Sequence, residues 1–201
     1  MKRLGFNIVL LGMITSGKDT QANALKKKYA LKTVETGAYS RKLLKKEGKD
    51  GDWARRTVGK GKPLPVVLMK KFLINEIGKK PKNKDLLFIG GPRLKPEAQL
   101  VKKIMNSMNQ NLFVLYITLP NKEVYKRSFY RKAGNAKNIY KILDTKDLIE
   151  PRIKWHKEQV GKTVKYFEKL KCLKKINGNQ SILKVTKDIE KAIEKYKETL
   201  Q

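Results

Sequence analysis

The sequence predicts an α/β fold in which helices cover both faces of a parallel sheet. An apolar segment of strand length, Phe6 to Leu11, leads into a glycine-containing loop and then into a helix. Further apolar segments of strand length alternate along the chain with longer segments of helical spacing, which is the pattern of a parallel sheet. The chain has 201 residues, of which 40% are apolar, so it can bury a core as one domain.

Each element follows from the spacing of its apolar residues. Apolar runs predict strands at 6–11, 86–89, 112–117 and 172–176. Helical spacing predicts helices over about 17–29, 66–77, 100–108, 121–131, 149–170 and 182–196. In the second of these helices, the expected apolar face includes Val67 and Ile74. Ligands of such sheets bind beyond the carboxyl ends of the strands, so the loop at Gly12 is predicted to lie at the ligand-binding edge.

The most informative segment is LLGMITSGKDTQA, which ends the first strand and begins the first helix. Gly12, Gly17 and Lys18 match the pattern G-x-x-x-x-G-K, but Asp19 stands where Ser or Thr is required, and Thr20 follows one position late. The N–H groups of such a loop, the helix N-terminus and the lysine together bind polyphosphate. Nucleotide binding is therefore the leading interpretation, and a simple glycine turn before a helix with an acidic first turn is the alternative.

Composition argues against several other kinds of site. The single cysteine, Cys172, excludes an internal disulfide and a zinc site built from several thiolates. The single histidine, His156, has no metal-ligand companion at close spacing, and we expect an ordinary surface or boundary residue. The apolar runs are too short to span a bilayer and the N-terminus lacks a signal-cleavage pattern, so we expect a soluble, cytoplasmic protein.

The net charge of +30 arises from 48 Lys and Arg against 18 Asp and Glu. A field of this sign attracts phosphates and nucleic acids. The lysines are scattered along the chain, however, and no RNA-binding motif accompanies them. We interpret most of the charge as solvated surface.

Several further segments, in the same order along the chain, resemble the adenylate kinases and related nucleoside monophosphate kinases. The resemblance runs from about Phe6 to Ile193 and includes the segments TGAYSR, GKPLP, GGPR and LPNKEVYKRSFYR. The phosphate loop of that family has one residue between its lysine and its threonine, which brings Thr20 into register. The resemblance implies a fold like that of the P-loop nucleoside triphosphate hydrolases, of the adenylate kinase type.

The resemblance also implies which residues form the site. Phosphoryl transfer between two nucleotides needs cations around the transferring group, and the catalytic residues would be Lys18, Arg93, Arg131 and Arg152. The ATP-binding residues would be Gly12, Thr15, Ser16, Gly17, Lys18, Asp19, Thr20, Arg127, Arg131, Gly178 and Gln180. The monophosphate-binding residues would be Thr36, Gly37, Arg41, Lys62, Leu64, Gly90, Arg93, Glu97, Lys141 and Arg152.

In the same way, the resemblance implies one kinase domain over residues 1–201. Its core would be formed by residues 1–34, 65–130 and 145–201, with a monophosphate-binding insertion at 35–64 and a short lid at 131–144. A lid of this length without cysteine implies the form that holds no zinc. Magnesium would accompany ATP, held by Thr20 and, through water, by Asp19, and the protein would be a monomer.

The chain departs from the family at several positions. Ala38 and Ile89 stand where the family has aspartates that orient magnesium-bound water, and Asp19 is either a replacement for them or an acid that only stabilises the helix N-terminus. Gly91 replaces an aromatic residue of the family motif. Glu97 aligns with the glutamine that reads adenine, and a carboxylate, which only accepts, suits guanine or cytosine better.

We favour an adenylate kinase that catalyses ATP + AMP to 2 ADP, with ATP and a nucleoside monophosphate as its partners. Two other functions are compatible with the sequence. One is a kinase for GMP or a pyrimidine monophosphate. The other is a catalytically weakened nucleotide-binding protein whose basic surface binds nucleic acid.

Overall fold

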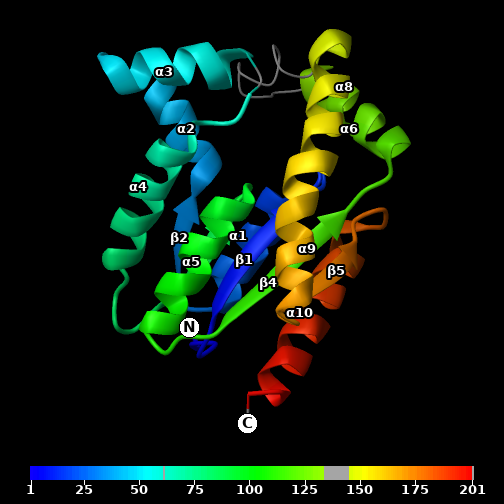
Figure 1. The fold of residues 1–201 in the computed structure, drawn as a ribbon. Coiled ribbons are helices and arrows are strands. Elements are labelled where there is room, and N and C mark those ends of the chain that lie inside the picture. Colours follow the sequence, from blue (N-terminus) through cyan, green and yellow to red (C-terminus); the bar gives the residue numbers. More distant parts are fainter. Residues whose placement is uncertain (61, 134–144, 201) are drawn as a thin grey trace.

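A computed structural model describes residues 1–60, 62–133 and 145–200 of the chain. Within these residues, five parallel strands form one sheet in the order β2-β3-β1-β4-β5 (Figure 1). The strands are β1 (Asn7–Gly12), β2 (Leu31–Glu35), β3 (Asp85–Ile89), β4 (Leu112–Thr118) and β5 (Leu173–Asn177). The predicted parallel α/β fold is confirmed.

Helices connect the strands. They are α1 (Lys18–Lys28), α2 (Thr36–Leu44), α3 (Lys49–Thr57), α4 (Val66–Gly78), α5 (Lys95–Ser107), α6 (Asn121–Ala133), α8 (Lys146–Trp155), α9 (Gly161–Lys169) and α10 (Ile182–Glu198). A short 3₁₀ turn, Val58–Lys60, follows α3, and a π-helical turn, His156–Val160, joins α8 to α9. Every predicted helix is present, whereas β2, α2 and α3 were not predicted.

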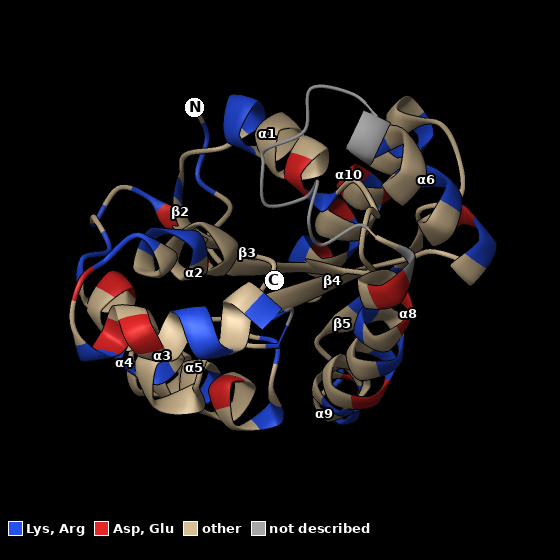
Figure 2. Ribbon diagram, turned by 90° about the horizontal axis from the view of Figure 1, so that it is seen from above, with Lys and Arg blue, Asp and Glu red and all other residues tan. Residues whose placement is uncertain are grey.

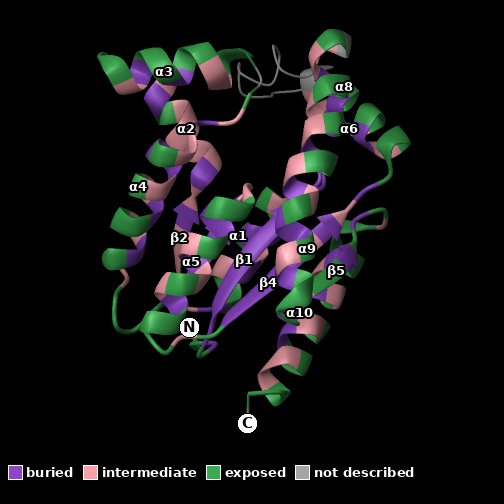
Figure 3. Ribbon diagram, in the orientation of Figure 1, coloured by how far each residue is buried: buried purple, intermediate pink, exposed green. Residues whose placement is uncertain are grey.

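The central strands β1, β3 and β4 are buried on both faces, which explains their almost wholly apolar sequences. Along β1, Ile8 and Leu10 face one core with α1 and α10. Val9 and Leu11 face the other core, which α4, α5 and α9 cover. Figure 3 shows the central strands buried and the outer surfaces of the surrounding helices exposed.

The predicted inner face of α4 is confirmed at Met69, Leu73 and Ile77, which are buried. It was wrong at Val67 and Ile74, which are 67% and 53% exposed. The segment VVLMKKFLI has apolar residues around most of the helix, so spacing alone is compatible with more than one buried face. Packing against the sheet selects one of them.

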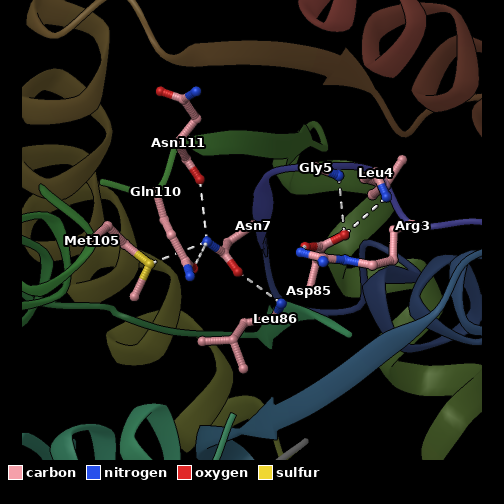
Figure 4. Close-up of polar contacts among 9 residues, drawn as sticks. All are labelled: Arg3, Leu4, Gly5, Asn7, Asp85, Leu86, Met105, Gln110 and Asn111. Carbon is pink, nitrogen blue, oxygen red and sulfur yellow. Dashed lines mark hydrogen bonds and ion pairs between the residues drawn. The ribbon is translucent and has the colours of Figure 1, made fainter. Parts of the chain in front are cut away.

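A buried carboxylate ties the N-terminal segment to the base of the sheet. Asp85 begins β3, and its Oδ2 accepts the backbone N–H groups of Leu4 at 2.8 Å and Gly5 at 3.1 Å. Its Oδ1 accepts a hydrogen bond from Arg3 Nη2 at 2.9 Å (Figure 4). This network braces the amino ends of the strands.

Asn7 makes a second polar link at the same end of the sheet. Its Oδ1 accepts the backbone N–H of Leu86 at 2.8 Å, and its Nδ2 donates to Gln110 Oε1 at 2.9 Å (Figure 4). The opposite edge, at the carboxyl ends of the strands, carries the longer connections. Figure 1 shows α2 and α3 beyond that edge on one side and α6 and α8 on the other.

Two further features of the described residues bear on the sequence predictions. None of the helices resolved in these ranges combines the length and apolar character needed to cross a membrane. Cys172 is buried beside β5, where its Sγ donates to the carbonyl oxygen of Phe167 at 3.6 Å, and burial raises the pKa of the thiol.

Candidate active site

The loop between β1 and α1 is shaped to receive an anion. Gly17 caps α1 in the left-handed region at φ 80°, and no side chain caps the helix there. The first N–H groups of α1 are therefore left for a ligand. A Cβ atom on Gly12 would lie 2.4 Å from Ser16 Oγ and 3.1 Å from the carbonyl oxygen of Ile117, so this position requires glycine. Thr15 also has a positive φ, 58°, a conformation that β-branched residues seldom adopt.

The loop opens into a central cavity that all four predicted catalytic residues border. The loop itself and α1 contribute Gly12, Thr15 and Lys18. The other elements contribute Lys62, Pro63, Gly90, Arg93, Arg131, Arg152, Trp155 and His156. All four residues predicted to be catalytic are thus together at one place.

A second cavity adjoins the first. Predicted residues that line it are Lys18, Asp19, Gly37, Arg41, Gly90 and Arg93. Ala38 and Ile89, the positions without the family aspartates, line it as well. Lys18, Gly90 and Arg93 border both cavities, so anions bound in the two cavities would meet at the same pair of cations.

The charge in the central cavity is strongly positive. The pKa of the Lys18 ammonium is lowered to about 8. Burial is the largest cause, the carboxylate of Asp19 opposes the shift, and Arg93, Arg131 and Arg152 add to it. Cations held this close repel one another. A bound polyanion relieves that repulsion, so the cavity is suited to the phosphates of a nucleotide.

Comparison with known proteins decides the family. The family model described as adenylate kinase matches residues 10–172 of the chain. The chain belongs to the adenylate kinase family. It is therefore a phosphotransferase of the nucleoside monophosphate kinase class.

Individual adenylate kinases match nearly the whole chain at modest identity. The adenylate kinase of Azobacteroides pseudotrichonymphae genomovar. CFP2 is 26% identical over 189 residues, which cover 94% of this chain and 97% of that protein. The adenylate kinase of Methanothrix thermoacetophila is 25% identical over 213 residues, with 94% and 99% covered. That of Staphylococcus aureus strain N315 is 25% identical over 207 residues, with 91% and 96% covered.

In this member of the adenylate kinase family, Arg127 and Gly178 lie together beyond the cavities. Arg127 donates from Nε to Glu123 at 2.7 Å and from Nη2 to the carbonyl oxygen of Gly178 at 3.1 Å. A Cβ on Gly178 would lie 2.6 Å from Ile117 Cγ2, so glycine lets the loop after β5 approach β4. Gln180, also predicted to bind ATP, donates a hydrogen bond to Asp188 of α10.

Other predicted residues are buried. Thr36 is buried, and its hydroxyl donates to the carbonyl oxygen of Ile89 at 3.3 Å. A Cβ on Gly91 would lie 2.6 Å from Thr36 Cγ2, so the backbone at this position leaves no room for a side chain. Leu64 is buried in the core. The hydroxyl of Ser16 is buried in the phosphate loop.

The Glu97 carboxylate accepts hydrogen bonds from the backbone. The residue is 3% exposed at the start of α5, and its Oε2 accepts the N–H groups of Arg93 at 2.8 Å and Leu94 at 3.2 Å. It is not among the residues that border either cavity. Lys141, predicted to bind the monophosphate, lies outside the described residues.

Adenylate kinases use magnesium together with ATP. In the described part of this chain, no group of three or more His, Cys, Asp and Glu side chains could hold a metal ion. Asp19 and Thr20 are exposed in the first turn of α1. Their carboxylate and hydroxyl oxygens are the kind of ligand that magnesium prefers, and magnesium commonly keeps several waters. These donors fit a nucleotide-bound magnesium ion held in part through water.

We expected His156 to be an ordinary surface or boundary residue. It is not at the surface: the residue is 9% exposed and borders the central cavity. Sequence reasoning also missed Asn23, Lys26 and Glu35, which line the second cavity. Asn23 and Lys26 follow Asp19 at helical spacing and could have been found from it, whereas the sequence gives no local signal for His156.

Proposed function

We propose that the protein transfers the terminal phosphoryl group of ATP to AMP, and that the reaction is reversible and forms two ADP. The observation that carries this proposal is that Lys18 and Arg93 border both cavities. An enzyme that transfers a group between two anionic substrates must bring their phosphates to one cluster of cations. The adenylate kinase names of the relatives support AMP as acceptor.

The residues of the two cavities suggest a division of roles. Lys18 and the N–H groups of the phosphate loop bind the ATP phosphates, and Arg131 and Arg152 approach the transferring group from α6 and α8. Arg41 and Arg93 bind the acceptor phosphate in the second cavity. The attacking phosphate oxygen is already ionised, so the reaction needs no general base. Positioning and charge stabilisation account for the catalysis.

We infer that Thr20 and, through water, Asp19 hold a magnesium ion that comes with ATP. Bound magnesium would neutralise charge on the phosphates that it bridges. The aspartates expected at 38 and 89 are absent. Asp19, the acid of the phosphate loop, is therefore our candidate to replace them.

We propose the domain organisation that the resemblance implies. Residues 35–64 would form the monophosphate-binding insertion, since α2 contributes Gly37 and Arg41 to the second cavity. Residues 131–144 would form the short lid, of which 134–144 lie outside the described residues. Closure of such segments keeps water from the transferring phosphate.

A coupled assay tests the function. ATP is supplied with AMP, GMP, CMP or UMP, each with and without magnesium, and ADP formation is followed. We expect the highest kcat/KM with AMP and magnesium. Faster turnover of GMP or a pyrimidine monophosphate would instead support the alternative kinase.

The absence of ADP formation with every acceptor, together with RNA binding that survives moderate salt, would contradict a kinase function. It would support the nucleic-acid-binding alternative. In Figure 2, viewed from above, Lys and Arg segments occur on helices at both sides of the sheet, which favours dispersed surface charge over one nucleic-acid-binding face.

A further inference from the structure

His156 stands at a change in backbone geometry inside the site. The π-helical turn His156–Val160 begins at this residue, between α8 and α9. Wide turns of this kind within helices occur frequently at functional sites. The imidazole borders the central cavity together with Lys18, Arg93 and Arg152. It is the one histidine of the chain.

Tyr116 of β4 orients the imidazole. Its Oη lies 3.4 Å from His156 Nε2, and the two rings are nearly parallel, with centroids 6.3 Å apart and an angle of 16° between their planes. A phenol is the better donor of this pair and an imidazole nitrogen the better acceptor, so we assign the shared proton to Tyr116. The imidazole proton then lies on Nδ1, which has no hydrogen-bond partner among the described residues.

Burial and the surrounding charges keep the imidazole neutral. Burial is the largest cause, Arg93, Lys18 and Arg152 add to it in that order, and together they lower the pKa of His156 to about 3. Burial also raises the pKa of the Tyr116 phenol. At neutral pH the pair is therefore an uncharged phenol and an uncharged imidazole. The imidazole offers one N–H donor and adds no further positive charge.

We propose that His156 is a phosphate-contacting residue, which donates its Nδ1–H to a phosphate oxygen of the bound nucleotides and is held in this tautomer by Tyr116. The proposal rests on the proposed phosphoryl transfer. His156 borders the same cavity as Lys18, Arg93 and Arg152, and an oxygen that takes up charge during transfer is stabilised by each hydrogen-bond donor that it gains.

The single histidine allows a direct test by NMR. Protein labelled with ¹⁵N-histidine gives one imidazole, whose two nitrogens report tautomer and charge separately. We expect a neutral Nδ1–H tautomer between about pH 5 and 8, and a shift of the Nδ1 signal when ADP or tripolyphosphate is added without metal. An Nε2–H tautomer, or an Nδ1 signal unchanged at saturating ADP, would overturn the proposal.

Kinetics of matched variants provide the second test. His156→Phe keeps an aromatic ring against Tyr116 but removes both nitrogens, and should lower kcat about ten- to a hundredfold, the range for one hydrogen bond to a charged group. Tyr116→Phe removes only the hydroxyl and should lower kcat less. The double variant should be no slower than His156→Phe alone. Tyr166→Phe, the same change on α9 outside both cavities, is the control and should keep the wild-type rate.

The two proposals can fail separately. A wild-type enzyme that converts ATP and AMP to ADP while His156→Phe matches its kcat would contradict the role of His156 and leave the kinase function intact. A wild-type protein that forms no ADP but shows the Nδ1 shift with tripolyphosphate would contradict the kinase function and support the phosphate contact.

Discussion

Glu97 Oε2 lies 2.8 Å from the backbone nitrogen of Arg93 and accepts its N–H. The same oxygen accepts the N–H of Leu94, so one carboxylate fixes both the start of α5 and the backbone of an arginine that borders both cavities. Glu97 thus positions the backbone of Arg93, which we propose to bind the acceptor phosphate.

The first prediction concerns Glu97 and base choice. The sequence suggests that Glu97→Gln would favour AMP, but the amide keeps an acceptor oxygen for Arg93, and we now expect the relative kcat/KM for AMP and GMP to stay unchanged. Glu97→Ala should cost about 1 kcal/mol of unfolding free energy because both N–H groups lose their partner. Competition assays and urea unfolding measure these effects. A clear increase in the kcat/KM of Glu97→Gln for AMP relative to GMP would indicate that Glu97 does read the base.

Lys18 is expected to stabilise the transferring phosphates. Lys18→Ala should lose about 3 kcal/mol of transition-state stabilisation, which is roughly a hundredfold in kcat/KM. Lys27→Ala, on the exposed side of the same helix, is the matched control and should retain activity. A near-normal rate for Lys18→Ala would remove the main support for phosphoryl transfer at this loop.

The lowered pKa of Lys18, about 8, predicts how ATP binding depends on pH. Bound phosphates favour the ammonium form, so above about pH 8 the free enzyme must take up a proton on binding. Affinity for ATP should therefore fall as pH rises, by up to about tenfold per pH unit. Calorimetry without metal, in buffers of different ionisation enthalpy, measures both the affinity for ATP and the proton uptake. In Lys18→Met, the affinity for ATP should no longer fall in this way as the pH rises.

Asp19 is expected to act through magnesium-bound water. Asp19→Asn should raise the magnesium concentration needed for half-maximal turnover, whereas Asp147→Asn, at the equivalent first turn of α8, should not. An unchanged magnesium dependence would mean that Asp19 only stabilises the helix N-terminus. Because Asp19 holds the pKa of Lys18 up, the same variant should also move the pH dependence of ATP binding to lower pH.

Asp85 is expected to stabilise the fold without touching the site. Its side chain is 3% exposed and holds two backbone N–H groups in addition to Arg3. Asp85→Ala should cost about 3 kcal/mol, and Arg3→Ala, whose side chain is 48% exposed, at most about 1 kcal/mol. Urea unfolding gives both values. If the two variants lost the same unfolding free energy, the stabilisation would come from the ion pair between Arg3 and Asp85 and not from the backbone hydrogen bonds.

The central strands β1, β3 and β4 were predictable because their sequences are almost wholly apolar. Strand β2 was not, since only Leu31 and Val34 are apolar in LKTVE, which lies at the edge of the sheet. Helices α2 and α3 were missed for a different reason. They are short and largely polar, and α3 contains Gly51, whose added Cβ would lie 1.8 Å from the carbonyl oxygen of Lys46. Close packing of this kind leaves no periodic signal.

Within the site, the residues of recognisable motifs were predictable and His156 was not. Lys18 and Arg93 belong to short segments whose order identifies them. The surroundings of His156 come from α1, β4, α8 and the loop after β3, which are far apart in the sequence. Its burial and its lack of charge are consequences of the tertiary structure.

The inaccessible thiol of Cys172 makes the chain convenient for site-specific labelling. Reagents that require an exposed thiolate should leave the native residue unmodified. A cysteine introduced on the outside of α3, for example Trp53→Cys, and another on α10 would then be the only sites to carry a pair of fluorescent dyes. Energy transfer between the dyes would report whether residues 35–64 move toward the sheet when nucleotides bind, without first removing any native residue.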